Sequence, residues 1–379
     1  MVKLAILCIF STLMLWLSAH RTSAATVPGR HYMYDRTDKY MLAAILWMAC
    51  FAFLRTGYND THAYINGFRN ALSVSESAAL GAYSKWTDNP LSRLYQDLMR
   101  SITDNYHVYF MLPALLQSIA VVKLIRHYSE DPALSILIFF SIGTYVLFIA
   151  AFKQSMAMTL LMLALPYADQ KKYLRFYLLV TVAVLFHFYA IVFVVVPLLR
   201  EQPWKRVTWL LLGLVVFCLL NYERTLGAFI DQVEAMGESI SEEEVFDGNS
   251  INFLRVVVYW VPAAMALIFQ RHLFYDSTPS DHLFANISIM AALVLTIGLA
   301  QGANLFARMA GYFEIGMAVT LPWMIRRIFN RESAKLVSLA AAILFFGYFV
   351  YEFTVAKDFA GGYTSISLWQ FFGELLEWR

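Results

Sequence analysis

The chain has 379 residues, of which 60% are hydrophobic and only 15% are charged, whereas a soluble domain carries roughly a quarter charged residues. Its formal net charge of +2 gives no reason to expect nucleic acid as a partner. Apolar runs of about 20 residues, the length that spans a bilayer, recur along the chain and predict an all-α, polytopic integral membrane protein. These runs are unbroken rather than alternating, which excludes an outer-membrane β-barrel.

Missing motifs exclude several other classes of protein. The cysteines Cys8, Cys50 and Cys218 lie singly within apolar runs, so they indicate neither a metal site nor a disulfide framework. The sequence contains no HExxH, DxD or GxSxG motif and no Gly-rich phosphate loop. These absences argue against metal-dependent sugar-nucleotide enzymes, serine hydrolases and ATPases, and we expect no metal and no cofactor.

The apolar segments predict about 10–11 transmembrane helices in one integral membrane domain that covers residues 1–379. In chain order they are 2–18, 40–54, 106–124, 133–151, 155–168, 174–199, 207–221, 253–270, 283–301, 305–325 and 335–355. A signal peptide is the alternative for the first segment, because a lysine precedes it and small residues follow. The longer polar stretches are 19–39, 55–105 and 222–252, and we expect the last two to be periplasmic loops.

Lysine and arginine in the connecting loops predict the orientation. The basic loops, expected in the cytoplasm, are 19–39, 123–132, 169–175, 200–206 and 326–335. Two of them, 169–175 and 200–206, are joined by a single run, 174–199, that is longer than one span needs. We therefore expect a re-entrant helix pair that turns near His187, in a place where the irregular backbone is buried in protein or lines a wet cavity. The alternative is one long tilted span.

Four polar sites then fall on the outer side: Arg55–Asp60, Lys153–Gln154, His187 and Arg308. Ionisable groups at membrane depth are costly, so each site is a functional hypothesis. Each also has a structural alternative. For the arginines it is snorkelling, and for Asp60 it is a helix cap before Thr61. For the lysine site it is a solvated turn, and for the histidine a hydrogen-bonded core residue.

Two or three cations around one outward-facing cavity suit a diphosphate group. Arginine binds phosphate oxygens bidentately, while lysine acts as a point charge. A histidine with a near-neutral pKa is the natural general base beside such a group. Together these residue types suggest a lipid-diphosphate leaving group and a nucleophilic hydroxyl.

Three segments in order resemble the EpsG family of Wzy-like exopolysaccharide polymerases through about residues 40–200. They read "FLRTGYNDTHAYINGF", "NPLSRLYQDLMRSITDNYHVYFMLPALL" and "FKQSMAMTLLMLALPYADQKKYLRFYLLVTVAVLFHFYAIVFVVVPLL". Further on, "FARMAGYFEIGMAV" is similar to the family's later Arg…Tyr-Phe element. The family's motif residues map onto Arg55, Asp60, Gln154, His187 and Arg308. One departure is Lys153, where the family usually has arginine, so that the charge is kept and the bidentate fork is lost.

The resemblance implies a glycosyltransferase of GT-C-like architecture at the outer face of a bacterial inner membrane. Such enzymes join oligosaccharide repeat units carried on undecaprenyl diphosphate, without a nucleotide sugar or a metal. Donor and acceptor are both lipid-linked. A chain-length regulator and polysaccharide export proteins are expected partners.

From the residues and the resemblance together we predict metal-independent, inverting glycosyl transfer. Arg55, Lys153, Gln154 and Arg308 are expected to hold the diphosphate, and His187 or Asp60 to take the proton of the acceptor hydroxyl. The aromatic residues expected to contact sugars are Tyr58, Tyr64, Trp86 and Tyr312. Two other classes stay open: a transporter or flippase for lipid-linked oligosaccharides, and a membrane acyltransferase. A transporter often has two related halves, and no such repeat is visible in the sequence.

We expect the polar segment 55–105 to form amphipathic helices over the cavity. Within it, Gly57 is expected to supply the turn of the "RTGYND" cluster.

Overall fold

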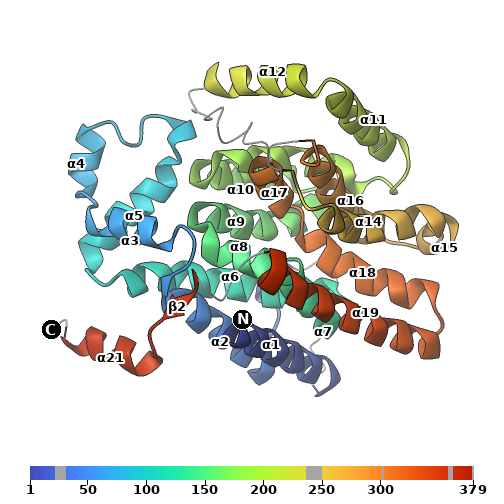
Figure 1. Ribbon diagram of the computed structural model, residues 1–379, viewed down its shortest axis with the longest axis horizontal. Coiled ribbons are helices and arrows are strands. Elements are labelled where there is room, and N and C mark those ends of the chain that lie inside the picture. Colours follow the sequence, from blue (N-terminus) through green and yellow to red (C-terminus); the bar gives the residue numbers. More distant parts are fainter. Residues whose placement is uncertain (22–30, 236–249, 301–302, 357–361, 378–379) are drawn as a thin grey trace. The chain divides into compact units, whose positions relative to one another are not determined.

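The computed structural model describes residues 1–21, 31–235, 250–300, 303–356 and 362–377. The chain divides into two compact units, which are treated separately below. The first unit comprises Met1–Leu163, Thr181–Phe188 and Leu339–Arg379, and the second comprises Ala164–Val180 and Tyr189–Ser338. Nearly all the described elements are helices (Figure 1). Among them α9, α10, η3 and α19 each contribute residues to both units.

The elements up to the middle of the chain are α1 (Val2–Arg21), η1 (Tyr32–Tyr34), α2 (Lys39–Phe53), β1 (Arg55–Gly57), α3 (Thr61–Arg69), α4 (Val74–Ala79), η2 (Trp86–Asp88), α5 (Pro90–Ile102), α6 (Tyr106–Tyr128), α7 (Pro132–Ser141), α8 (Thr144–Ala150), α9 (Phe152–Asp169), α10 (Tyr173–Phe186) and η3 (Phe188–Arg200). They are followed by α11 (Arg206–Leu220), α12 (Tyr222–Ala235), α14 (Phe253–Ile268), α15 (Gln270–Phe274), α16 (Pro279–Ile297), α17 (Ala303–Gly311), α18 (Ile315–Ile328), α19 (Arg331–Tyr351), η4 (Glu352–Ala356), β2 (Thr364–Ser365) and α21 (Leu368–Glu377).

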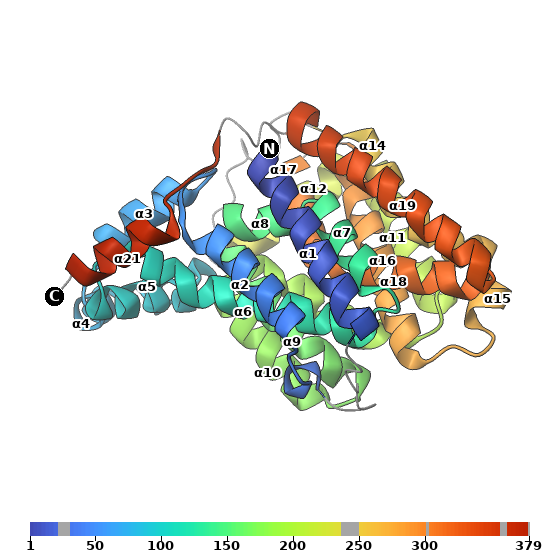
Figure 2. The same cartoon turned by 90° about the horizontal axis from the view of Figure 1, so that it is seen from below.

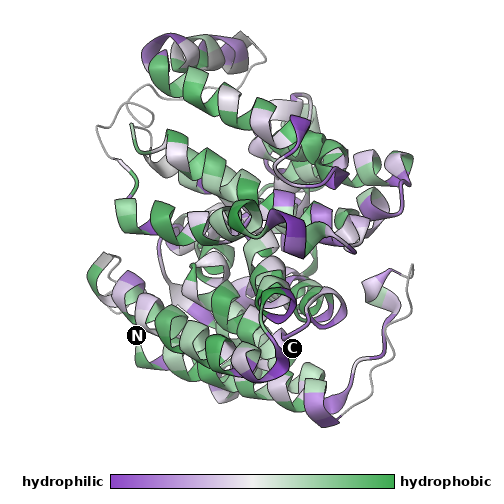
Figure 3. Cartoon of the chain, turned by 90° about the vertical axis from the view of Figure 1, so that its right-hand side faces the viewer, coloured by the Kyte–Doolittle hydropathy of each residue, from purple (hydrophilic) through white to green (hydrophobic). Residues whose placement is uncertain are grey.

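The predicted all-α, polytopic class is confirmed. Among the described residues, four helices are long and apolar enough to cross a membrane, namely α1, α6, α16 and the continuous run Arg331–Val355. The number rises to six if the bent pairs α7–α8 and α11–α12 each form one span. This is fewer than expected, because α2, α10, η3 and α14 are apolar helices of only 10–17 residues. Figure 3 shows hydrophobic residues along most of the helices.

One end of the first unit gathers basic residues. Here α1 and α6 end and α2 begins, and Ser18 donates from Oγ to Asp38 Oδ2, 2.5 Å away. Arg126 of α6 donates from Nε to the same serine hydroxyl at 3.1 Å. Lys123 Nζ donates to the carbonyl of Met33 at 2.6 Å. The described parts of the predicted basic loops 19–39 and 123–132 therefore lie at the same end of the helices, while residues 22–30, Arg30 among them, lie outside the described residues.

At the opposite end, the segment after α2 forms a small antiparallel sheet with the C-terminal segment. Arg55 pairs with Ser365 and Gly57 with Thr364, with an irregularity in register between them. A Cβ on Gly57 would lie 2.7 Å from Thr364 Oγ1, so glycine is required for the strands to approach. The prediction that Gly57 makes the turn is therefore wrong. Asn59 makes it instead, with a left-handed φ of 45°.

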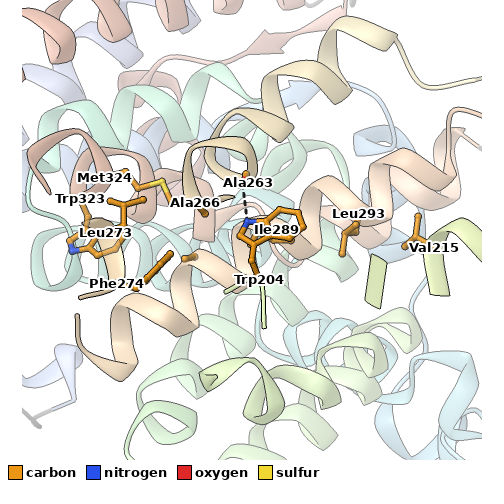
Figure 4. Close-up of a cluster of buried hydrophobic side chains, with 11 residues drawn as sticks. Trp204, Val215, Ala263, Ala266, Leu273, Phe274, Ile289, Leu293, Trp323 and Met324 are labelled. Atoms are coloured by element: carbon orange, nitrogen blue, oxygen red, sulfur yellow. Dashed lines mark hydrogen bonds between the residues drawn. The ribbon is translucent and has the colours of Figure 1, made fainter. Parts of the chain in front are cut away.

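The second unit has its own apolar core, and Figure 4 shows Trp204 in it. The indole Nε1 of Trp204 donates to the carbonyl of Ala263 at 3.0 Å. The buried residues around it are Val215, Ala263, Ala266, Leu273, Phe274, Ala285, Ile289, Leu293, Trp323 and Met324. A bound indole N–H and close-packed aliphatic neighbours are what a buried tryptophan requires.

The predicted span 305–325 is divided into two helices, α17 and α18. Residues 312–314 lie between them, and the side chain of Glu314 is buried. Arg255 Nη2 lies 3.2 Å from Glu314 Oε1, and the hydroxyl of Tyr259 also donates to that oxygen. The break is therefore held by a buried carboxylate that has both a cation and a hydroxyl as partners. The acidic stretch Ser241–Gly248 of the predicted loop 222–252 lies outside the described residues.

Candidate functional site

A buried guanidinium marks the end of α2. The side chain of Arg55 is 2% exposed. Its Nε donates to Thr61 Oγ1 at 3.2 Å, and its Nη1 donates to the carbonyl of Ala52. The central carbon lies 3.9 Å from the centroid of the Phe110 ring, which is within cation–π distance. Backbone, hydroxyl and ring thus fix the position of this cation.

No carboxylate neutralises Arg55 among the described residues. It belongs to none of the ion pairs found there, and the groups whose electrostatic effect favours its charged form are Tyr363, Tyr109, Tyr145 and Tyr64. Its Nη2 is buried and has no hydrogen-bond partner within the described part of the chain. Burial lowers the pKa of Arg55 to about 10, which leaves the group charged at neutral pH. A buried charge without a counter-ion is costly, and an incoming anion would remove that cost.

The N-terminus of α9 adjoins this cation through a cluster of aromatic rings. Phe152, the first residue of α9, has its ring centroid 5.7 Å from that of Phe110. The ring of Tyr64 lies 5.4 Å from Phe152. Lys153 and Gln154 follow Phe152 within the first turn of α9. They are helical, so the alternative that they form a solvated turn is wrong. Lys153 is half-buried and Gln154 is buried. In a first helical turn the backbone N–H groups favour an anion.

His187 lies at a break between two helices, as predicted. The amide of the following residue, Phe188, donates to Asn89 Oδ1 at 3.0 Å. The ring of Trp86 lies 5.3 Å from that of Phe188. Asn89 has a left-handed φ of 54° and stands at the start of α5. The predicted contact residue Trp86 therefore lies beside Phe188, the residue that follows the predicted base His187. The re-entrant return of the chain stays a prediction.

Helix α5 connects the break at His187, called here the histidine break, with Arg55 and the surrounding rings of Phe110 and Phe152, called here the arginine cluster. Tyr95 of α5 donates its hydroxyl to the carbonyl of Tyr109 at 2.7 Å, and its ring lies 6.0 Å from Phe152. Asn89 and Tyr95 are six residues apart, or about 9 Å along a helix. The first two turns of α5 thus connect the His187 break with the rings that surround Arg55. The predicted amphipathic helices of segment 55–105 are present as α3, α4 and α5.

Asp60 stands at the N-cap of α3 but makes no capping hydrogen bond with its side chain. Its neighbour Thr61 accepts from Arg55 and donates to the carbonyl of Tyr58. Burial, and then the charge of Glu352, raise the pKa of Tyr58 to about 12. The cap alternative for Asp60 is therefore not seen, while the turn that carries Asp60 also orients Arg55.

Arg308 and Tyr312 belong to the second unit. Arg308 lies in α17 and is half-buried, and Tyr312 follows that helix and is buried. Arg308 and Tyr189 are electrostatic neighbours of Tyr312. Within the second unit, these three residues form a group that contains a cation.

His107 was not singled out by the sequence analysis. Its Nδ1 donates to the carbonyl of Phe53 at 2.8 Å, and the side chain is fully buried. A carbonyl partner fixes the proton on Nδ1, so Nε2 presents a lone pair. Among the described residues Nε2 has no hydrogen-bond partner, and Arg55 is an electrostatic neighbour. The only signal in the sequence was a histidine in the first turn of a long apolar run.

Within the described ranges, no three histidine, cysteine, aspartate or glutamate side chains are placed to hold a metal ion. No curated protein and no solved structure matches the chain. The model of the EpsG family, however, matches residues 38–368, and so covers the arginine cluster, the start of α9, the histidine break and the group around Arg308. Because the match extends over most of its length, this chain belongs to the EpsG family.

Proposed function

We propose that this protein is a polysaccharide polymerase that joins undecaprenyl-diphosphate-linked oligosaccharide repeat units at the outer face of the bacterial inner membrane. The observation that carries the proposal is the buried cation of Arg55. It has no carboxylate partner among the described residues, its buried Nη2 amino group has no hydrogen-bond partner there, and the N-terminus of a helix lies beside it. A diphosphate offers the anionic oxygens that this arrangement lacks.

The proposed reaction is an inverting glycosyl transfer. The acceptor sugar's hydroxyl oxygen attacks the anomeric carbon of the donor from the face opposite the diphosphate. The bond from that carbon to the diphosphate oxygen breaks, and the lipid diphosphate leaves with the electron pair. Arg55 and Lys153 stabilise the negative charge that develops on the leaving group, and Gln154 supplies an amide donor. The diphosphate contact expected from the sequence for Arg308 stays a prediction.

A base receives the proton of the acceptor hydroxyl. The predicted candidates are His187 and Asp60, and the geometry adds His107, whose Nε2 lone pair is oriented by the bond from its other nitrogen to Phe53. A histidine is suited to this step because its neutral and protonated forms are close in energy near pH 7. Tyr58, Tyr64 and Trp86 are the proposed sugar contacts, and the contact expected from the sequence for Tyr312 stays a prediction.

The test is an assay of the purified full chain in vesicles that contain lipid-linked repeat units and no nucleotide sugar. A ladder of lengthening saccharides on lipid supports the polymerase. Movement of unchanged units across the bilayer would indicate a flippase, and acylated units an acyltransferase. Either of these results, without a ladder, contradicts the proposal.

A further inference from the structure

An apolar groove lies between α1, α2 and the C-terminal segment 363–368 of the first unit. Its volume is about 670 Å³, within the usual range of ligand sites. Figure 2 shows α1 and α2 side by side, and the two helices pack along their length. The reaction described above uses none of the residues that line this groove.

The two ends of the groove differ in polarity. On α1 the lining residues Lys3, Ile6 and Phe10 follow one face. Lys3 Nζ donates to Ser365 Oγ at 3.4 Å, whereas Phe10 packs against Trp47 of α2 in a tilted arrangement, with 4.8 Å between the ring centroids. From Lys3 to Phe10 the groove extends about 10 Å along α1. A ligand that fits it is therefore an anionic amphiphile with its head near Lys3 and its hydrocarbon chain between the helices.

The cationic end adjoins the strand that carries Arg55. Leu54, which lines the groove, directly precedes Arg55, and Ser365 is the strand partner of Arg55. Tyr363 also lines the groove. Of the groups whose electrostatic effect raises the pKa of Arg55, Tyr363 has the largest effect. Its hydroxyl donates to the carbonyl of Phe51 at 2.6 Å, and the two rings stack at 4.4 Å. The groove thus begins where the proposed diphosphate site ends.

We propose that this groove holds the polyprenyl chain of the lipid-diphosphate substrate, with Lys3 assisting Arg55 at the diphosphate. The inference rests on the proposed function for the identity of the lipid. A bilayer phospholipid with an anionic head could also bind in an apolar groove near a lysine. Only a lipid diphosphate, however, is the proposed ligand of Arg55, and the head of such a lipid would therefore lie at the strand that carries Arg55.

The experiment introduces the photoreactive residue p-benzoylphenylalanine at Ile6 or Trp47, which line the groove, and at Leu13 or Leu42, which lie on the same helices outside it. These side chains are 52%, 47%, 48% and 49% exposed, so random contact with lipid is matched. The full chain is irradiated in phosphatidylethanolamine and phosphatidylglycerol vesicles with tritiated undecaprenyl diphosphate. We expect labelling at Ile6 and Trp47 to exceed that at Leu13 and Leu42 by about tenfold.

Excess unlabelled undecaprenyl diphosphate should abolish this labelling, and excess phosphatidylglycerol should leave it unchanged. Equal labelling at all four positions, or displacement by phosphatidylglycerol, overturns the inference. In the Ile6 crosslinking protein, Lys3→Gln should reduce labelling about fivefold and Lys3→Arg should restore it, because one basic residue near a membrane surface is worth about that factor. Ala43→Phe should block the groove, while its matched neighbour Leu42→Phe should not.

Labelling needs no catalysis, so the two proposals fail separately. If the chain is labelled selectively but makes no polymer, the proposal for the groove is retained and the proposal that the protein is a polymerase is contradicted. A chain that makes polymer but is labelled equally at all four positions would contradict the groove alone.

Discussion

The guanidinium carbon of Arg55 lies 3.9 Å above the ring of Phe110, and the ring of Phe152 lies 5.7 Å from that same phenylalanine. One aromatic ring therefore contacts both the buried cation at the end of α2 and the first residue of α9. This relationship places Lys153 and Gln154 close to Arg55, although about one hundred residues separate them in the chain.

Replacing Arg55 by methionine should separate its stabilising and functional roles. Methionine has a similar length and needs no counter-ion, so we expect the melting temperature to stay the same or rise. Polymer formation should fall by at least about a hundredfold, the effect of losing one electrostatic stabiliser of a leaving group. The control is Arg69→Met, because Arg69 also stacks on a ring, that of Tyr106 at 5.5 Å, but is exposed. Severe unfolding of Arg55→Met would show that the arginine is structural.

From the resemblance to the EpsG family we expect arginine at the position of Lys153. Lys153→Arg should keep or raise the rate of polymerisation, because the fork adds a second hydrogen bond to phosphate. Lys153→Ala should lower it by about ten- to a hundredfold, the loss of one charge-assisted contact. Lys172→Ala, in the exposed loop after α9, should have no effect on the same assay. If the Lys153→Ala variant is as active as the unmodified chain, Lys153 does not contact the diphosphate.

Asn89 anchors the break at His187, and its backbone is left-handed. Glycine tolerates that backbone but cannot accept the hydrogen bond from Phe188, so Asn89→Gly should lower activity by about tenfold. Aspartate keeps the acceptor oxygen, so Asn89→Asp should retain most of the activity. Rates are compared in the same lipid-linked assay at equal protein levels. If the glycine and aspartate variants behave alike, the bond to Phe188 does not position the histidine.

His107→Asn should keep a donor near the position of Nδ1, and so the bond to Phe53, while removing the Nε2 lone pair. If His107 is the base, the rate should fall by at least about a hundredfold with little change in melting temperature, and the dependence of the rate on pH should flatten between about pH 5 and 8. His20→Asn is matched, because His20 Nδ1 also contacts a backbone carbonyl, that of Trp16 at 2.9 Å. An unchanged pH profile in the His107 variant would exclude it and leave His187 and Asp60.

Gly57→Ala should separate β1 from β2. The new methyl would meet Thr364 Oγ1, and overpacking of this kind costs about 1–3 kcal/mol. The melting temperature of the purified protein should fall. Adding Thr364→Ala should recover part of the loss, because it removes the atom that clashes. A double variant no more stable than Gly57→Ala would mean that the clash is not relieved at this contact.

The sequence predicted the helical membrane class well, because long apolar runs have one common solution in a bilayer. It also predicted the break at His187, since polar and aromatic residues interrupt a long run there. It could not predict the pairing of β1 with β2, because residues 55–57 and 364–365 are too short and too distant in sequence to form a recognisable pattern. His107 was missed because nothing in sequence reveals that one ring nitrogen is bonded and the other left without a partner.

The central claim is that the buried charge of Arg55 exists for a lipid diphosphate. It is tested most directly by the length distribution of saccharide products made by the purified full chain and by its Arg55→Met variant from lipid-linked repeat units. We predict a ladder of products from the unmodified chain and single, unextended units from an equally folded Arg55→Met variant. A ladder of equal length and yield from both proteins would contradict the account.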